Sequence, residues 1–334
     1  MLAKVMIMKY QGLMEILFVK LGALGDVINT LPLAVSLKNH LNARITWLVE
    51  PLSFPIINGH SSVDKVILFD KKNWSDSLFE VLKEIRGGRF DIALDLQRIL
   101  KSASFTMASK ALRRIGFDRK RCKECTWLFP FERIARADSG RHMAVQYLDF
   151  ARHLGVDDPQ VKWDIPVSGE VPFNLPDEYV VLNIGATKKA NLWPEENFSV
   201  LAEMIKSNLG INSVITGGRE DAGSSIAITE KAKDCVINLA GKTTISELKE
   251  VIAGARLVVS CDTGPMHLAV ALNKKVLALF GPSDPKRTGP LYGEVIQKSL
   301  DCVPCNKRSC DDPKCMHEIT PHDVFASMEA VWSA

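Results

Sequence analysis

The segment with the clearest chemical potential runs C-D-T-G-P-M-H from Cys261 to His267. It follows a β-branched apolar run and precedes a helical pattern, which predicts a strand, a turn and a helix N-terminus. The free N–H groups and the dipole at a helix N-terminus favour phosphate, Thr263 and His267 add donors, and Gly264 permits close backbone approach. We therefore expect a diphosphate-bearing ligand here. The alternative is that Asp262 simply caps an ordinary helix.

A second turn, K-L-G-A-L-G-D, runs from Lys20 to Asp26 near the other end of the chain. It lacks the third glycine and the spacing of the dinucleotide fingerprint, which argues against a nicotinamide enzyme. It places the carboxylate of Asp26 at a helix start and at the carboxyl end of a strand, where open α/β sheets bind ligands. An ionised, fixed carboxylate there suits a general base, whereas a plain helix cap is the alternative.

The basic residues are unevenly distributed. Residues 101–150 hold eleven Lys/Arg and five Asp/Glu, and six of those basic residues fall between Arg113 and Lys123. A solvated basic face and a dock for an anionic partner both explain this excess.

Four cysteines near the carboxyl end have the spacing C-x2-C-x4-C-x4-C: Cys302, Cys305, Cys310 and Cys315. Such spacing is compatible with a zinc or iron–sulfur site, with His317 as a further ligand. We favour structural thiols or an incidental disulfide, and expect no metal. A metal-dependent redox module is a third hypothesis for the whole protein, supported by these cysteines alone. A second pair, Cys122 and Cys125, is weaker evidence for a metal.

The chain has 334 residues, 46% of them hydrophobic and 24% charged, with a net charge of +3. No apolar run approaches the roughly 20 residues that span a bilayer, and the N-terminus lacks a secretory signal pattern. We therefore expect a cytoplasmic protein. Residues 1–13 resemble an appendage before the first strand pattern, so Met14 is an alternative start. A true amphipathic lead segment is the other possibility.

Short β-rich runs alternate with helical patterns twice, on either side of a proline-containing stretch from Asp157 to Pro176. This alternation predicts parallel sheets covered on both faces, in two Rossmann-like domains that face a cleft. Expected strands are at 16–20, 44–49, 65–69, 91–94, 114–116, 179–184, 212–216, 236–238, 256–260 and 275–280. Expected helices are at about 27–41, 75–87, 101–112, 139–154, 195–208, 223–233, 244–253, 264–272 and 320–332.

Five motifs, in this order along the chain, resemble those of the ADP-heptose:lipopolysaccharide heptosyltransferases, glycosyltransferase family 9. They are F-V-K-L-G-A-L-G-D-V-I-N-T-L-P at 18–32, N-I-G-A at 183–186, W-P-E-E-N-F at 193–198, D-T-G-P-M-H at 262–267 and L-F-G-P-S-D-P at 279–285. Each motif is modest alone, but five in the family's order are highly specific.

The resemblance covers about residues 15 to 330 and implies an α/β protein of GT-B fold. It implies an amino-terminal acceptor domain at 1–165, a nucleotide-sugar domain at 177–315, and a terminal helix within 316–334 that packs back on the first domain. It also implies inverting transfer without a metal, in which the acceptor hydroxyl attacks the sugar from the face opposite ADP.

The resemblance assigns roles to particular positions. The catalytic base is Asp26. The donor-binding residues are Thr187, Glu220, Asp262, Thr263, Gly264 and His267, to which we add Lys188 and Lys189. The acceptor-binding residues are Gly22 and Gly25, to which we add Arg119, Lys120 and Arg121 from the basic segment.

One position departs from the family pattern. Family members usually carry a phosphate-contacting lysine two residues before the Trp-Pro pair, where this chain has Asn191. Lys188 or Lys189 is expected to supply the missing cation. For the ribose-binding carboxylate we choose Glu220, with Asp221 as the alternative.

The leading hypothesis is a heptosyltransferase that moves heptose from ADP-heptose, a substrate, to the lipopolysaccharide inner core, with no cofactor. Its expected partners are the ADP-sugar, an anionic Kdo–lipid A or heptosylated acceptor, and the inner-leaflet surface as a peripheral site, but no nucleic acid. The rival is a non-catalytic sugar-nucleotide-binding protein of the same fold, favoured by Asn191 and disfavoured by Asp26.

Overall fold

The computed structural model describes residues 13–332, which divide into two compact units between Pro166 and Val167. The expected appendage at 1–13 lies outside the described residues apart from Leu13. The division falls inside the expected linker, where residues 156–178 form neither helix nor strand. The first part of this linker is fastened to the first unit, since the Trp163 carbonyl lies 2.6 Å from Nε2 of His60.

The first unit contains one sheet of six parallel strands in the order β3-β2-β1-β4-β5-β6. This is the doubly wound order, in which the strand order reverses between β1 and β4. The strands are β1 (Met14–Val19), β2 (Ala43–Val49), β3 (Lys65–Leu68), β4 (Ile92–Asp95), β5 (Arg113–Gly116) and β6 (Glu132–Arg133).

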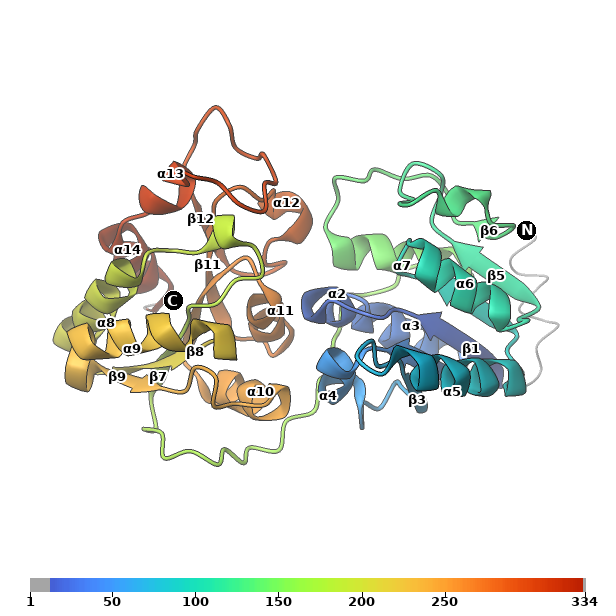
Figure 1. The fold of residues 1–334 in the computed structure, drawn as a ribbon, viewed down its shortest axis with the longest axis horizontal. Coiled ribbons are helices and arrows are strands. Elements are labelled where there is room, and N and C mark those ends of the chain that lie inside the picture. The colour runs from blue at the N-terminus through green and yellow to red at the C-terminus, as the bar shows by residue number, and fades with distance from the viewer. Residues whose placement is uncertain (1–12, 333–334) are drawn as a thin grey trace. The chain divides into compact units, whose positions relative to one another are not determined.

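Helices cover both faces of this sheet, with α5 packed beside α6 and α3 beside α7 (Figure 1). The strands β1 and β4 are therefore buried on both sides, which explains their nearly continuous apolar sequences. The helices are α2 (Leu24–Ile28), α3 (Leu31–Leu41), α4 (Phe54–Ile57), α5 (Trp74–Gly87), α6 (Leu100–Ala108) and α7 (Met143–His153), with short 3₁₀ turns η1 (Pro51–Ser53) and η2 (Thr126–Leu128).

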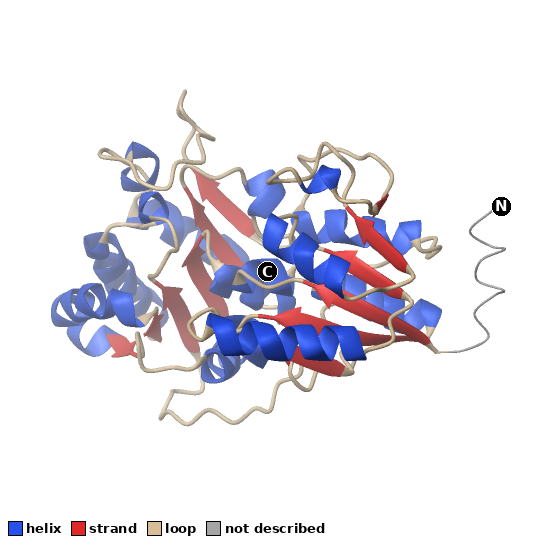
Figure 2. Cartoon of the chain, turned by 45° about the vertical axis from the view of Figure 1, so that its right-hand side comes forward, coloured by secondary structure: helices blue, strands red, loops and turns tan. Residues whose placement is uncertain are grey.

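The second unit repeats this topology. Its sheet has the order β12-β11-β10-β7-β8-β9, again all parallel, with the reversal between β7 and β10. Figure 2 shows the strands of both sheets in red between blue helices. The strands are β7 (Tyr179–Asn183), β8 (Asn212–Thr216), β9 (Val236–Asn238), β10 (Leu257–Cys261), β11 (Lys275–Phe280) and β12 (Glu294–Gln297).

The helices of the second unit pack as α8 with α9 and α14, and as α10 with α11. They are α8 (Glu195–Leu209), α9 (Ala222–Ala232), α10 (Ile245–Gly254), α11 (Gly264–Ala271), α12 (Pro285–Thr288), α13 (Lys314–His317) and α14 (Pro321–Trp332), with 3₁₀ turns η3 (Lys189–Asn191), η4 (Arg219–Asp221) and η5 (Lys233–Cys235).

The α/β class and the two Rossmann-like sheets are confirmed, and two details differ. The helix expected at about 27–41 is two helices, because Pro32 lacks the N–H that would continue α2 and instead begins α3. The short edge strands β6 and β12 had no recognisable sequence pattern. Within its own unit, the terminal helix α14 packs on α8, β11 and β12.

Candidate active site

Asp26 lies where a doubly wound sheet binds its ligands. It stands in the first turn of α2, directly after β1, at the point where the strand order reverses between β1 and β4. Its side chain is 38% exposed. The carboxylate is thus both held by a helix start and accessible to solvent.

A buried lysine accompanies this carboxylate. The Lys20 ammonium donates a hydrogen bond of 3.0 Å to Oδ2 of Asp26, and the Lys20 side chain is only 1% exposed. Burial alone would raise the pKa of the Asp26 carboxyl, but the Lys20 charge, with those of Arg98 and Lys123, outweighs it and lowers the pKa below its ordinary value. Asp26 is therefore ionised at neutral pH, as a general base must be.

Lys20 is held by the core of the first unit. Its carbonyl accepts a hydrogen bond of 3.0 Å from the indole N–H of Trp47, and its ammonium lies 5.3 Å from the centre of the Tyr147 ring. Burial tends to lower the pKa of Lys20, but the Asp26 carboxylate outweighs this effect and raises it. The sequence analysis assigned no role to Lys20. The feature that could have indicated one is the position of a charged residue at the end of an apolar strand.

A second buried cation lies near Asp26. Arg98 follows β4, is 6% exposed, and stacks its guanidinium 4.9 Å from the centre of the Phe117 ring. Its backbone adopts a positive φ of 67°, and its N–H donates to Asp95, over 3.2 Å. Sequence reasoning also missed Arg98, because its nearness to Asp26 depends on the pairing of β4 with β1.

The three basic residues expected to bind the acceptor differ in their exposure to solvent. Arg119 and Lys120 are exposed. The prediction that Arg121 binds the acceptor is corrected by the structure. The Arg121 side chain is fully buried and forms ion pairs with Asp118 and, over 2.6 Å, with Asp149. A guanidinium paired in this way stabilises the fold and does not face an acceptor.

The two expected acceptor-binding glycines also differ. Gly22 is half-buried in the loop before α2, and its N–H lies 3.5 Å from Oε1 of Gln97. Gly25 is buried in the first turn of α2.

The expected phosphate turn occupies the matching position in the second unit. It follows β10, beside the reversal between β7 and β10, and α11 begins at Gly264. Thr263 is the N-cap residue, but its side chain makes no capping hydrogen bond, and His267 is 9% exposed in the first turn of α11. The first N–H groups of α11 and these two side chains form an arrangement suited to an anion.

Lys188, rather than Lys189, is directed to this turn. The Lys188 ammonium lies 3.4 Å from Oγ of Ser283, whereas Lys189 is exposed. Burial raises the pKa of the Asp262 carboxyl, an effect that Ser283, Lys188 and Asn191 only partly offset. The side chains of Lys188, Ser283 and Asp262 therefore form one cluster, in which Ser283 is a residue that sequence reasoning did not assign.

Asn191, the departure from the family pattern, is part of the same cluster. It is 1% exposed, and its amide nitrogen donates over 3.2 Å to Oδ2 of Asp262. Among the described residues its buried Oδ1 has no hydrogen-bond partner. This side chain thus neutralises Asp262 less effectively than a lysine would.

The remaining donor-side residues lie in loops at the carboxyl ends of β7 and β8. Thr187 is exposed. Asp221 accepts a hydrogen bond of 2.7 Å from the backbone N–H of Gly218, so its carboxylate caps its own turn. Glu220 is exposed. Of the two carboxylates, Glu220 is the more exposed.

The carboxyl-terminal cysteines lie near one another. Burial raises the pKa of the Cys315 thiol, and Cys302, Cys305 and Cys310 raise it further. All four are free thiols, three of them exposed. Among residues 13–332, no group of three or more His, Cys, Asp or Glu side chains is arranged to hold a metal ion.

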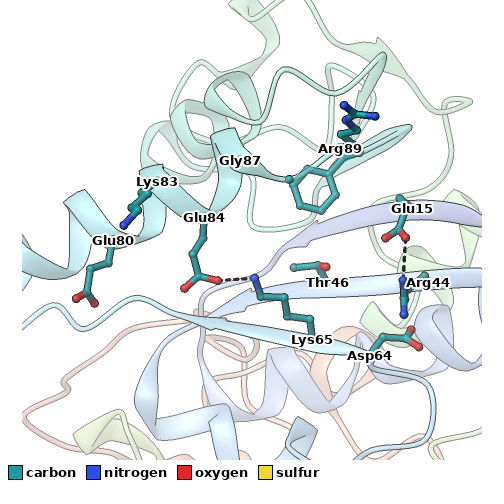
Figure 3. Close-up of a pocket in the computed structure, with 12 residues that line it drawn as sticks. Glu15, Arg44, Thr46, Asp64, Lys65, Glu80, Lys83, Glu84, Gly87 and Arg89 are labelled. Atoms are coloured by element: carbon teal, nitrogen blue, oxygen red, sulfur yellow. Dashed lines mark hydrogen bonds and ion pairs between the residues drawn. The ribbon is translucent and has the colours of Figure 1, made fainter.

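A cavity of about 1160 Å³ in the first unit is not the site of this chemistry. It lies at the start of strands β1, β2 and β3, whereas Asp26 follows the end of β1. Figure 3 shows Glu15, Arg44, Lys65 and Glu84 around it. These charges pair with one another, Arg44 with Glu15 over 3.4 Å and Lys65 with Glu84 over 2.6 Å.

Residues 78–316 match the model of glycosyltransferase family 9 (heptosyltransferase). The chain belongs to this family. It is 28% identical to lipopolysaccharide heptosyltransferase 1 of Pseudomonas aeruginosa, covering 95% of this chain and 98% of the relative. It is 26% identical to lipopolysaccharide heptosyltransferase 1 of Escherichia coli K12, covering 84% and 92%. It is therefore a glycosyltransferase, placed by its relatives among the heptosyltransferases of lipopolysaccharide biosynthesis.

Solved structures show the same fold. The E. coli heptosyltransferase WaaC with ADP superposes with a TM-score of 0.79 at 23% identity, covering 95% of this chain and 99% of that one. A family 9 glycosyltransferase from Veillonella parvula gives a TM-score of 0.80 at 22% identity, covering 95% and 96%. The GT-B fold expected from the motifs is thus confirmed.

Proposed function

We propose that this enzyme transfers heptose from ADP-heptose to the lipopolysaccharide inner core with inversion and without a metal or other cofactor. One observation carries the proposal. Each sheet presents a distinct chemical group at its strand-order reversal, an ionised carboxylate at Asp26 in the first unit and an anion-binding turn at Asp262–His267 in the second.

Asp26 would act on the acceptor hydroxyl. Its carboxylate accepts the hydroxyl proton as the oxygen attacks the anomeric carbon, and the sugar–phosphate bond breaks on the opposite face. Lys20 orients Asp26 through the 3.0 Å hydrogen bond and keeps it ionised.

The second unit would stabilise the leaving ADP. Negative charge grows on the bridging phosphate oxygen as the bond breaks, and preorganised donors lower the barrier by meeting that charge. Here the donors are the first N–H groups of α11, the side chains of Thr263 and His267, and the Lys188 ammonium. Thr187 adds a hydroxyl, and Glu220 is available to the ribose hydroxyls.

The acceptor side is cationic. Arg98 and Lys123 are among the charges that lower the pKa of Asp26, and Arg119 and Lys120 are exposed on the same loop as Lys123. Such a surface suits a Kdo–lipid A or heptosylated core acceptor, and we propose no nucleic-acid partner. Among the described residues no helix is long and apolar enough to cross a bilayer. We propose that the enzyme works in the cytoplasm, peripheral to the inner membrane.

Asn191 favours one alternative, a sugar-nucleotide-binding protein without turnover. Incubating purified protein with ADP-heptose and a set of truncated core acceptors distinguishes the two. Mass spectrometry of the acceptor should show one added heptose, and ADP should be released in equal amount. ADP-heptose binding with no product on any acceptor supports the alternative.

A further inference from the structure

The loop between β5 and β6 presents two bulky apolar side chains to solvent. Trp127 is 37% exposed and Leu128 is 75% exposed, both on the single 3₁₀ turn η2. A lone exposed leucine needs no explanation, but a tryptophan beside a leucine at the tip of one turn forms a compact apolar surface.

This exposure is built into the fold. The Arg133 guanidinium donates hydrogen bonds of 2.8 Å to the carbonyls of Thr126 and Phe129, which flank the turn. Thr126 is buried, and the Phe129 ring packs against Phe131 with ring centres 5.6 Å apart. These contacts fix the backbone of the turn. Binding to a surface therefore requires little further ordering of the turn that carries Trp127 and Leu128.

Cations surround this apolar tip. The Arg119 guanidinium lies 5.6 Å from the centre of the Trp127 ring, and Lys120 and Lys123 are exposed on the same loop. The exposed acid of this segment, Glu124, is engaged, since its carboxylate accepts a hydrogen bond of 3.1 Å from the backbone N–H of Leu100. Tryptophan prefers the headgroup level of a bilayer, and each nearby Lys or Arg adds attraction to anionic lipid.

We propose that Trp127 and Leu128 form an apolar anchor that enters the interfacial layer of an anionic bilayer, while Arg119, Lys120 and Lys123 contact the lipid headgroups. The inference rests on the proposed function, in which the acceptor is lipid-linked. The anchor lies in the loop between β5 and β6, a few residues after Lys123, whose charge acts on Asp26. Docking of this loop brings lipid headgroups to Lys123.

A second pair of exposed apolar side chains, on α5, has no excess of cations on its own helix. Trp74 and Phe79 on α5 are 63% and 72% exposed. That helix carries three acids, Asp76, Glu80 and Glu84, and two cations, Lys83 and Arg86. The helix itself therefore has no excess of cations, whereas the loop has one, so the pair on α5 is a matched control.

The test measures binding of the purified full chain to phosphatidylcholine vesicles with and without phosphatidylglycerol. The double variant Trp127→Ala/Leu128→Ala should bind anionic vesicles roughly tenfold or more weakly, because the buried apolar area is lost. Trp74→Ala/Phe79→Ala should bind as the wild type does. Leu128→Ala alone, at the most exposed position of the turn, serves if the double variant does not fold.

A second measurement tests insertion itself. Vesicles of brominated lipid should quench the fluorescence of Trp127 in the wild type, and Trp127→Phe should bind nearly as well but lose that quenching. The anchor proposal would be wrong if Trp127→Ala/Leu128→Ala and Leu128→Ala both bound anionic vesicles as strongly as the wild type. It would also be wrong if Trp74→Ala/Phe79→Ala lost vesicle binding.

Failure of the anchor is distinguishable from failure of the proposed function. With a delipidated core acceptor, the Trp127→Ala/Leu128→Ala variant should turn over like the wild type. Turnover on that acceptor without vesicle binding by the wild type refutes the anchor alone. Vesicle binding without turnover on any acceptor refutes the transferase function.

Discussion

The Lys20 ammonium lies 3.0 Å from Oδ2 of Asp26, with the lysine 1% exposed and the aspartate 38% exposed. The pair thus has a buried cationic end and an accessible anionic end. Removing one partner of a buried pair leaves the other charge uncompensated, so the two residues have separable roles that mutation can distinguish.

Asp26→Asn should keep the size of the side chain while removing the base. Turnover should fall on the order of 10²–10⁴-fold, since general-base catalysis contributes about that much. ADP-heptose binding, measured by calorimetry, should be nearly unchanged. Turnover within a few-fold of the wild type would show that Asp26 is only a helix residue.

Lys20→Met should change the pH dependence of the reaction. The base works when deprotonated, and the wild-type pKa of Asp26 is lowered, so the acidic limb of kcat/KM should lie below the ordinary carboxylate range. Without the Lys20 charge, burial raises this pKa, and the limb should move to higher pH. An unmoved acidic limb in the variant would remove Lys20 from the control of Asp26.

Lys188→Met should weaken ADP binding roughly 10- to 100-fold, as expected for loss of a charged hydrogen-bond donor. Lys189→Met is the matched control, because that side chain is exposed, and it should bind ADP like the wild type. Asn191→Lys should be tolerated or should improve binding, because it places a cation beside Asp262. Equal effects of the Lys188 and Lys189 substitutions would contradict this assignment.

Gly264→Val should weaken ADP binding by blocking approach of phosphate to the first turn of α11. Gly223→Val is the control, since Gly223 is also a helical glycine and has open space around its Cβ position. Calorimetry on both folded variants measures the difference. An unchanged ADP affinity in Gly264→Val would argue against a phosphate site at this turn.

Arg121→Ala should destabilise the protein rather than the acceptor complex. Breaking its buried pairing with Asp118 and Asp149 should lower the free energy of unfolding by about 3–5 kcal/mol. Lys120→Ala, one position earlier and exposed, should change it by no more than about 0.5 kcal/mol. Chemical unfolding of the two variants is the measurement, and similar stabilities would contradict the structural role of Arg121.

The cysteine tail should be dispensable for chemistry. Replacing Cys302, Cys305, Cys310 and Cys315 with Ser should lower stability, because Cys315 is buried, but turnover per folded molecule should survive. Elemental analysis of protein purified without chelator is the opposing test. About one zinc per chain, with loss of folding on its removal, would make the tail a structural metal site.

The sequence alone determined the repeated strand–helix alternation, the family and the positions of Asp26 and the Asp262–His267 turn. These features are local. Apolar periodicity, a glycine turn and a helix start are all written in neighbouring residues, so a linear reading can find them.

The tertiary structure decided which neighbours those groups have. Lys188 and Lys189 are adjacent in sequence, yet only Lys188 reaches Ser283, which follows a different strand. Arg121 belongs to a basic run, but the pairing with Asp149 on α7 buries it. Burial and pairing depend on contacts between distant segments, and these contacts separate otherwise similar residues into donor-site, structural and surface roles.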